Sequence, residues 1–300
     1  MSVSSLNASA LAAGPIAISH EQRKSFARDG AICVRGVLDS PWLNRLSKLF
    51  EQLKRQGRDL SGYYGDEKSQ RPGSGRGQTI VCDDCWCLEA LFLRFLRESP
   101  LAATAAALLD SRQLNLFEDL LIYKSAGAEQ PTPWHQDEPQ WPLSGKQMAS
   151  GWFCLDPVTK DTGSLRFALG THNGPLYRPV VPHEREADVV ADAHYFDGGR
   201  LPDVEVEPAR FAVRVFDVSP GDVVFFHPRV LHAALGSAPC YPRRTFSVRF
   251  LGDDVRWLPK RSVFHDWLKR VPLNAGDCIS GERFPLLWSG SAATRTQVAP

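Results

Sequence analysis

The chain has 300 residues, of which 43% are hydrophobic, and its 35 Lys and Arg residues nearly balance its 34 Asp and Glu residues. A chain of this length and composition can bury a full hydrophobic core. The balanced charge argues against a nucleic-acid-binding or membrane-surface protein. No uncharged apolar run in the sequence approaches the roughly 18 residues that suggest a membrane span.

The first 18 residues are rich in Ser and Ala and have no basic region ahead of their apolar part, so we expect residues 1–18 to form a mobile tail. The seven cysteines are odd in number and scattered, as is typical of reduced thiols in a cytoplasmic protein. Cys82, Cys85 and Cys87 are spaced closely enough for a zinc knuckle. Because no second pair of cysteines matches them, we prefer ordinary packing and keep zinc as the alternative.

Helices are predicted in the N-terminal part. Ser19 and Gln22 have the spacing of a capping box before a helix that should end at Gly30, and 31–34 should be a strand. A second helix is expected over 40–57, where apolar residues recur at helical spacing.

A Gly- and Ser-rich stretch follows at 58–77 and should be a long loop, with the Tyr63-Tyr64 pair placed to overhang a site. Asp83 and Asp84 should cap a helix that runs to Leu96, and Ser99-Pro100 should start another that runs to Leu109. These helices are expected to cover one side of the molecule.

From Gln113 onward the pattern changes to β-strands. Alternating or β-branched runs predict strands at 114–124, around His135, and at 149–155, 163–168, 212–218, 221–226 and 245–250. Many short strands favour a double-stranded β-helix, a cupin-like jelly roll with flanking helices and a pocket between its sheets. We expect residues 19–300 to form one catalytic domain, with a lid insert at 174–210 and a C-terminal extension at 257–300 that includes a helix around 262–270.

A metal site is predicted from His135, Asp137 and His232. Residues i and i+2 of a strand project from the same face, so His135 and Asp137 can reach one ion, and His232 can supply a third ligand. Two imidazoles and one carboxylate are the ligand set of mononuclear non-haem iron(II) oxygenases. The alternative is an ordinary polar surface strand.

Arg243 follows His232 by eleven residues and precedes a strand-like run. A guanidinium can bind the distal carboxylate of a dicarboxylic acid such as 2-oxoglutarate through two hydrogen bonds. Arg244 should point to the opposite face of the strand. His227 competes with His232 as the third ligand, but Arg243 has this spacing only from His232.

These features together resemble the phytanoyl-CoA dioxygenase family of Fe(II)- and 2-oxoglutarate-dependent oxygenases, over residues 20 to 255. The resemblance rests on the segments 132–137, 152–156, 162–167 and 170–172. It implies that Fe(II), 2-oxoglutarate and O2 are used to hydroxylate a small molecule, free or tethered to a thioester or carrier, with release of succinate and CO2. Desaturation or cyclisation stays open.

The resemblance also implies roles for single residues. Lys124 and Trp152 match positions that contact 2-oxoglutarate, although a surface lysine and a core tryptophan would explain them too. His172 matches a position that could support the site. Ala234 departs from the family, where a small hydroxyl residue helps to bind the co-substrate, so binding should be weaker by about 1 kcal/mol. Related halogenases have a small residue in place of Asp137, so halogenation is not expected.

Two other functions remain compatible with the sequence. A cupin-type metalloenzyme could use the same three ligands without 2-oxoglutarate, but it would have no use for Arg243. A catalytically silent binding protein would be expected to have lost part of the ligand set.

Overall fold

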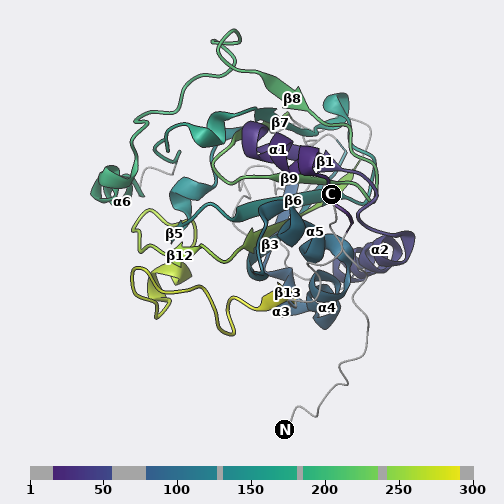
Figure 1. Ribbon diagram of the computed structural model, residues 1–300. Coiled ribbons are helices and arrows are strands. Elements are labelled where there is room, and N and C mark those ends of the chain that lie inside the picture. The colour runs from purple at the N-terminus through teal and green to yellow at the C-terminus, as the bar shows by residue number, and fades with distance from the viewer. Residues whose placement is uncertain (1–15, 56–78, 127–130, 181–184, 236–241, 291–300) are drawn as a thin grey trace.

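The computed structural model describes residues 16–55, 79–126, 131–180, 185–235 and 242–290 (Figure 1). The predicted loop at 58–77 and residues 1–15 of the predicted tail lie outside these ranges. At the end of the predicted tail, the backbone N–H of Ile16 donates to Thr104 Oγ1 at 3.3 Å. Ile18 is buried.

Two antiparallel sheets form the body of the protein. In order across the larger sheet, the strands are β1 (Ala31–Val34), β9 (Val223–Phe226), β6 (Met148–Cys154), β11 (Arg243–Leu251), β3 (Gln113–Lys124) and β13 (Leu286–Ser289), with β2 (Thr79–Asp83) also paired to β3. The smaller sheet has the order β4 (Thr132–His135), β10 (Leu231–Ala234), β7 (Leu165–Ala168) and β8 (Val213–Val215).

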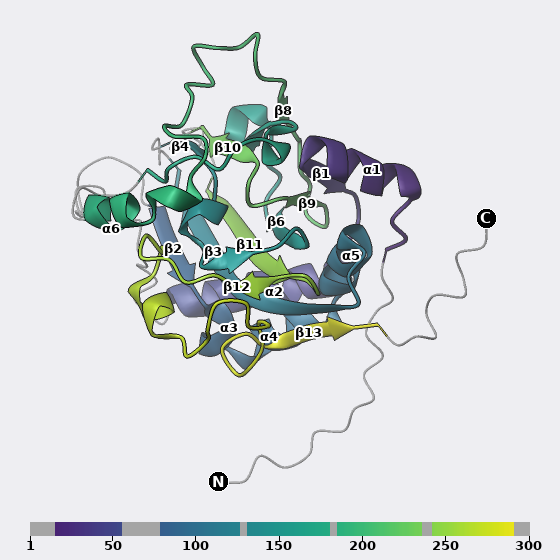
Figure 2. The same ribbon diagram turned by 60° about the vertical axis from the view of Figure 1, so that its left-hand side comes forward.

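The chain passes back and forth between the two sheets. From β3 in the larger sheet it passes to β4 in the smaller sheet, returns to β6, and crosses again to β7 and β8. It then returns to β9 in the larger sheet, crosses to β10 and comes back to β11 (Figure 2). This winding is a double-stranded β-helix, so the predicted fold is confirmed. It brings β4 and β10, which are distant in sequence, next to each other.

The alternation of β11 separates two environments. Phe246, Val248 and Phe250 belong to the main hydrophobic core beneath the helices. Residues 243, 245, 247 and 249 of the same strand point to the opposite face, because successive side chains of a strand alternate. Cross-strand pairing places Arg243 opposite Lys124 and Ser247 opposite Trp152. One face of the strand therefore builds the core and the other builds the site.

Helices cover the outer face of the larger sheet. They are α1 (His20–Asp29), α2 (Ser40–Arg55), α3 (Cys85–Leu88), α4 (Ala90–Glu98) and α5 (Pro100–Leu109). The predicted capping box of Ser19 and Gln22 is present at α1. Packing joins the helices to the sheet, since Phe92 lies 5.3 Å from Phe246 and Phe95 lies 5.6 Å from Phe153 between ring centroids.

The predicted helix from Asp83 to Leu96 is wrong in detail. Asp83 ends strand β2, and Glu89 adopts an extended conformation that separates α3 from α4. Asp84 makes no side-chain capping bond. Its carboxylate is instead 2.6 Å from Arg283 of the C-terminal segment, an interaction that local spacing could not reveal.

The C-terminal segment packs against the body of the fold. It contributes β12 (Arg256–Trp257), which pairs with β5 (Leu143–Ser144), and strand β13 at the edge of the larger sheet. The helix expected at 262–270 is a shorter 3-10 helix, η6 (Asp266–Arg270). Phe284 stacks on Phe117 at 6.2 Å, so this segment completes a second hydrophobic cluster.

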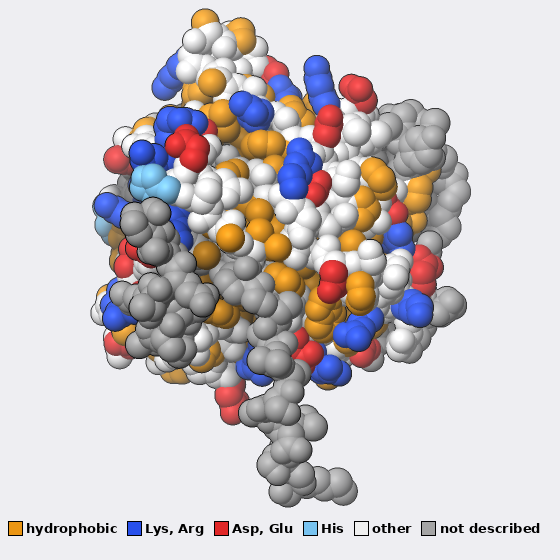
Figure 3. Space-filling model, turned by 45° about the vertical axis from the view of Figure 1, so that its right-hand side comes forward, with side chains coloured by type: hydrophobic (Ala, Val, Ile, Leu, Met, Phe, Trp, Pro, Cys, Tyr) orange, Lys and Arg blue, Asp and Glu red, His pale blue; other side chains and the backbone are white. Residues whose placement is uncertain are grey.

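The surface carries no strong charge of one sign on the face shown in Figure 3, where basic and acidic side chains are interspersed. This agrees with the formal net charge of +1. None of the helices in the described ranges is long and apolar enough to cross a membrane.

Candidate active site

Strands β4 and β10 bring two histidines together. His135 is the last residue of β4 and lies directly opposite His232 of β10 in the antiparallel pair. His232 is the second residue of β10 (Leu231–Ala234). This pairing fixes both imidazoles on one side of the smaller sheet.

Asp137 reaches the histidines by a different route from the predicted one. It does not continue strand β4, because its backbone is in the helical region and the 3-10 helix η1 (Glu138–Gln140) begins after it. The backbone N–H groups of Asp137 and Glu138 both donate to the Pro228 carbonyl, at 2.8 and 3.1 Å. The segment that leads into β10 therefore holds this turn in place. The turn directs the Asp137 carboxylate toward the two imidazoles.

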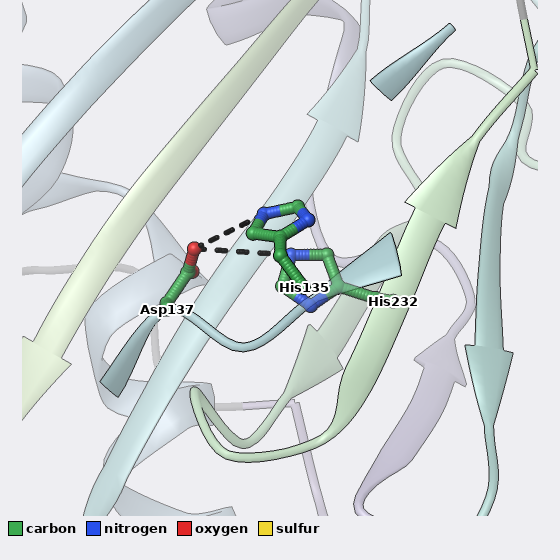
Figure 4. Close-up of side chains that lie close together, drawn as sticks. All are labelled: His135, Asp137 and His232. Carbon is green, nitrogen blue, oxygen red and sulfur yellow. Dashed lines mark ion pairs between the residues drawn. The ribbon is translucent and has the colours of Figure 1, made fainter. Parts of the chain in front are cut away.

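The three side chains converge on one point (Figure 4). Asp137 Oδ1 lies 3.5 Å from His135 Nε2 and 3.9 Å from His232 Nε2. One ligand atom from each residue lies within 4.8 Å of the other two. Since Fe–N bonds are about 2 Å long, like those at zinc, one ion can contact all three atoms.

Hydrogen bonds fix which nitrogen of each imidazole faces this point. His135 Nδ1 lies 2.9 Å from the Pro133 carbonyl, and His232 Nδ1 lies 3.0 Å from the Val230 carbonyl. A carbonyl oxygen only accepts, so each Nδ1 carries the proton and each Nε2 keeps its lone pair. This tautomer is the one in which a histidine binds metal through Nε2.

Electrostatics favour the metal-binding protonation states of His232 and Asp137, whereas at His135 burial alone would lower the pKa, but the hydrogen bond to Asp137 and the charge of Asp137 outweigh burial and raise the pKa. Burial, helped by the charge of His135, lowers the pKa of His232 to about 4, so this ring is neutral near pH 7. Burial alone would raise the pKa of Asp137, but the hydrogen bond to His135 and the charge of His232 outweigh it, so the pKa of Asp137 is lowered. Neutral imidazole and ionised carboxylate are the forms that bind divalent metals.

A cavity of about 290 Å³ opens at these three residues. Its wall includes Lys124 and Trp152, the two residues expected near the co-substrate. The rest of the wall is largely apolar, and it includes Leu120, Ile122, Trp141, Leu165, Phe226 and Phe264. Both sheets and the C-terminal segment therefore contribute to one site.

Arg243 and Arg244 point in opposite directions, as expected. Arg244 forms an ion pair with Asp156 at 2.7 Å on the helix side. Arg243 is buried beside Lys124, donates to the Gly163 carbonyl, and leaves its Nε without a hydrogen-bond partner. Within the described ranges, no carboxylate forms an ion pair with Arg243, and burial lowers its pKa to about 10. A buried guanidinium of this kind fits an anionic ligand.

Gln136 connects the insert at 174–210 to the site. Its Nε2 donates to the carbonyls of Pro175 and Arg229, at 3.1 and 2.7 Å. Its Oε1 accepts from the backbone N–H of Tyr177 at 2.9 Å. Gln136 thus holds the start of the 174–210 insert beside the three candidate metal ligands. No local sequence pattern predicts this role.

The family of this chain follows from comparison with known proteins. The family model for phytanoyl-CoA dioxygenase matches residues 26–244. The chain belongs to the phytanoyl-CoA dioxygenase family. A probable phytanoyl-CoA dioxygenase of Caenorhabditis elegans is 23% identical over 250 residues, which cover 79% of this chain and 77% of the relative.

Solved structures similar to this family member confirm the fold. The epimerase SnoN from nogalamycin biosynthesis, crystallised with Fe3+, alpha ketoglutarate and nogalamycin RO, has a TM-score of 0.68 and 22% identity, covering 89% of this chain and 97% of SnoN. The carbocyclase SnoK from the same biosynthesis has a TM-score of 0.67 and 22% identity, covering 92% of this chain and 100% of SnoK.

Other candidate residues of this family member lie away from the cavity. His227 and His172 face each other at 5.5 Å between ring centroids, and His172 Nε2 lies 3.1 Å from the Ala27 carbonyl of α1. His232, not His227, therefore converges with His135 and Asp137. Cys82 and Cys85 are buried, and among the described residues neither belongs to a possible metal-binding group.

Proposed function

We propose that this chain is an Fe(II)- and 2-oxoglutarate-dependent dioxygenase that oxidises a small molecule. Two observations carry the proposal: three candidate ligand atoms converge at the cavity, and the guanidinium of Arg243, buried next to the cavity-lining Lys124, forms no ion pair with a carboxylate of the described residues. His135, Asp137 and His232 would hold iron on one face and leave the opposite face open. Iron bound with 2-oxoglutarate and O2 supplies the oxidising chemistry, in which 2-oxoglutarate is converted to succinate and CO2.

Arg243 and Lys124 would bind the far carboxylate of 2-oxoglutarate. Burial lowers the pKa of Lys124 to about 8, and repulsion from the neighbouring charge of Arg243 adds to this shift. A carboxylate placed between them would relieve this repulsion. A metalloenzyme that does not use 2-oxoglutarate would gain nothing from this pair of cations.

Trp152 and the apolar wall would exclude water from the reacting groups. Tyr177, Arg178 and Leu201 of the insert line the cavity, so we propose that 174–210 covers the bound substrate. Ala234 offers no hydroxyl group, so the co-substrate is held with one hydrogen bond fewer than in relatives. Hydroxylation is the proposed outcome. The substrate is a small molecule, and tethering to a thioester or carrier stays a prediction.

The compartment also stays a prediction. The described cysteines are all free thiols, which fits the reducing environment of the cytoplasm.

The test is an assay of the purified protein with Fe(II), 2-oxoglutarate and O2. We expect succinate in amounts equal to the 2-oxoglutarate consumed. The rate of succinate formation should rise when the assay contains a panel of small molecules that includes the substrate. The His232→Ala variant should be inactive. O2 uptake that is independent of 2-oxoglutarate would support the cupin-type alternative, and failure to bind iron under anaerobic conditions would support the silent binding protein.

A further inference from the structure

Buried charged side chains extend from Asp137 into the protein interior. Arg249 Nη2 lies 3.8 Å from Asp137 Oδ1, and Arg249 Nη1 forms an ion pair with Glu118. Glu118 Oε2 lies 3.3 Å from His265 Nε2, which in turn lies 3.9 Å from Asp83 Oδ2. We call these five residues the buried charge row. They come from the η1 turn, β11, β3, the C-terminal segment and β2.

Stability alone does not account for the buried charge row. Arg249, Glu118 and His265 are 8%, 1% and 7% exposed. Removing a charge from water costs several kcal/mol, and well-packed hydrophobic residues often stabilise a core as well as a buried ion pair does. Arg249 also lines the metal cavity. The guanidinium of Arg249 is costly to bury, and it faces the candidate metal ligand Asp137. This position indicates a role at that ligand.

The geometry of Arg249 suits a bridge between two carboxylates. Its two terminal nitrogens face different partners, Nη1 toward Glu118 and Nη2 toward Asp137. The guanidinium carbon lies 5.0 Å from the centre of the Trp141 ring, a contact that favours a fixed orientation of the cation. A lysine ammonium has no planar fork and could not present separate N–H groups to both carboxylates in this way.

Much of this arrangement lies outside the segment that defines the family. The family match ends at residue 244, so Arg249 and His265 come after it. Phe264, next to His265, also lines the cavity. The C-terminal segment thus reaches the site twice, once through an apolar side chain and once through the buried charge row.

We propose that Arg249 is a positioning residue for Asp137. Held by Glu118, its guanidinium keeps Asp137 Oδ1 turned toward the two imidazole Nε2 atoms, and His265 joins the C-terminal segment to Glu118. This inference rests on the proposed function only for the identity of the three metal ligands. Removal of a contact that orients a metal ligand typically lowers the metal affinity about 10- to 100-fold.

The test is a titration of the metal-free protein with Co(II), whose visible absorption reports coordination geometry. Arg249→Gln should weaken Co(II) binding about tenfold or more and change the absorption of the bound ion. Glu118→Gln should act in the same direction, and Arg249→Lys should weaken binding less, because it keeps the charge but loses the bridge. Arg244→Gln is the matched control. It removes ion pairs from the opposite face of the same strand and should leave Co(II) binding unchanged.

Folding of each variant is checked by circular dichroism, and the free energy of unfolding is measured in urea. A folded Arg249→Gln protein with wild-type Co(II) affinity and absorption would overturn the proposal. If Arg249→Gln does not fold, Arg249→Lys decides, since unchanged affinity would overturn the proposal and weakened affinity would support it. A wild-type protein that binds Co(II) through these ligands but forms no succinate with Fe(II) contradicts the proposed function and leaves this inference standing.

Discussion

At the residue scale, we expect the carboxylate of Asp137 to determine which group the proposed iron site can transfer. As a metal ligand, it would fill the position that a chloride ion needs in a halogenase. We therefore expect the wild-type protein to give an oxygenated or dehydrogenated product and no chlorinated one, even in high chloride. Mass spectrometry of the product checks this, and a chlorinated product would refute the role given to Asp137.

Replacement of Asp137 tests the role of the same residue by removing its carboxylate. Asp137→Ala removes a charged ligand, so we expect weaker iron binding and greatly reduced succinate formation. Gain of halogenation is not expected, because chloride also needs neighbouring groups to hold it. Iron affinity and succinate are measured on the same preparation. Undiminished activity would remove Asp137 from the metal site.

The two neighbouring arginines give a further prediction. Arg243→Ala should raise the KM for 2-oxoglutarate strongly, since a charge-assisted bidentate contact would be lost. Arg244→Ala should raise it only slightly, because Arg244 faces Asp156 and Ser47 on the helix side. Initial rates at varied 2-oxoglutarate measure both. The reverse order of effects would show that Arg244 is the co-substrate residue.

At the scale of elements, strand β3 carries a buried acid on its helix side. Burial raises the pKa of Asp119 to about 8, although the backbone N–H of Trp86 partly opposes this shift. The unfolded chain loses this proton near the ordinary value of 3.8. Between these two values the folded protein holds a proton that the unfolded chain lacks. Its contribution to stability is therefore complete below the lower value and is lost as pH rises through the upper one.

This linkage predicts a difference between the wild type and Asp119→Asn. The free energy of unfolding in urea should fall between pH 5 and pH 8 by a larger amount in the wild type, because Asn has no proton to lose. Other titrating groups are common to both proteins, so their effects largely cancel in the comparison. Equal declines in the two proteins would mean that Asp119 does not hold a proton in the folded state.

Strand alternation explains how much of the site could be predicted from the sequence. The opposite directions of Arg243 and Arg244 follow from the two-residue period of a strand, whereas the position of Trp152 at the cavity was expected only from the family resemblance. The position of Asp137 does not follow, because its turn depends on the Pro228 carbonyl from a distant segment. In the sequence, Glu118 and Arg249 look like ordinary polar strand residues. Only the register of β3 and β11 places them opposite each other, and this register cannot be read from either strand alone.

At the scale of the whole molecule, the C-terminal segment should unfold together with the jelly roll. Phe284 is buried between Phe117 and Trp257. Phe284→Ala should therefore cost about 3–5 kcal/mol of stability. Leu286, in the same segment, is 44% exposed, and Leu286→Ala should cost far less.

Urea unfolding followed by tryptophan fluorescence and by circular dichroism measures both variants. We expect a single transition in the wild type that shifts to lower urea in Phe284→Ala. A separate early transition for the C-terminal segment, with the main transition unchanged, would show that this segment is an independent unit and does not belong to the predicted single domain.

The fold class could be predicted at this scale because many short alternating strands have few stable arrangements other than two facing sheets. The contribution of the C-terminal segment could not, since its contacts with β3, β5 and the cavity join residues far apart in sequence. The edge strands β2 and β13 were missed for the same reason. Their pairing with β3 depends on the position of that strand at one side of the sheet.

At the proposed active site, one metal ion and one 2-oxoglutarate molecule would share the cavity between the sheets. A crystal structure of the protein with Fe(II) and 2-oxoglutarate, prepared without O2, tests this most directly. We predict that iron is bound by His135, Asp137 and His232, and that the far carboxylate of 2-oxoglutarate contacts Arg243. Iron bound elsewhere, or 2-oxoglutarate placed away from Arg243, would contradict the account.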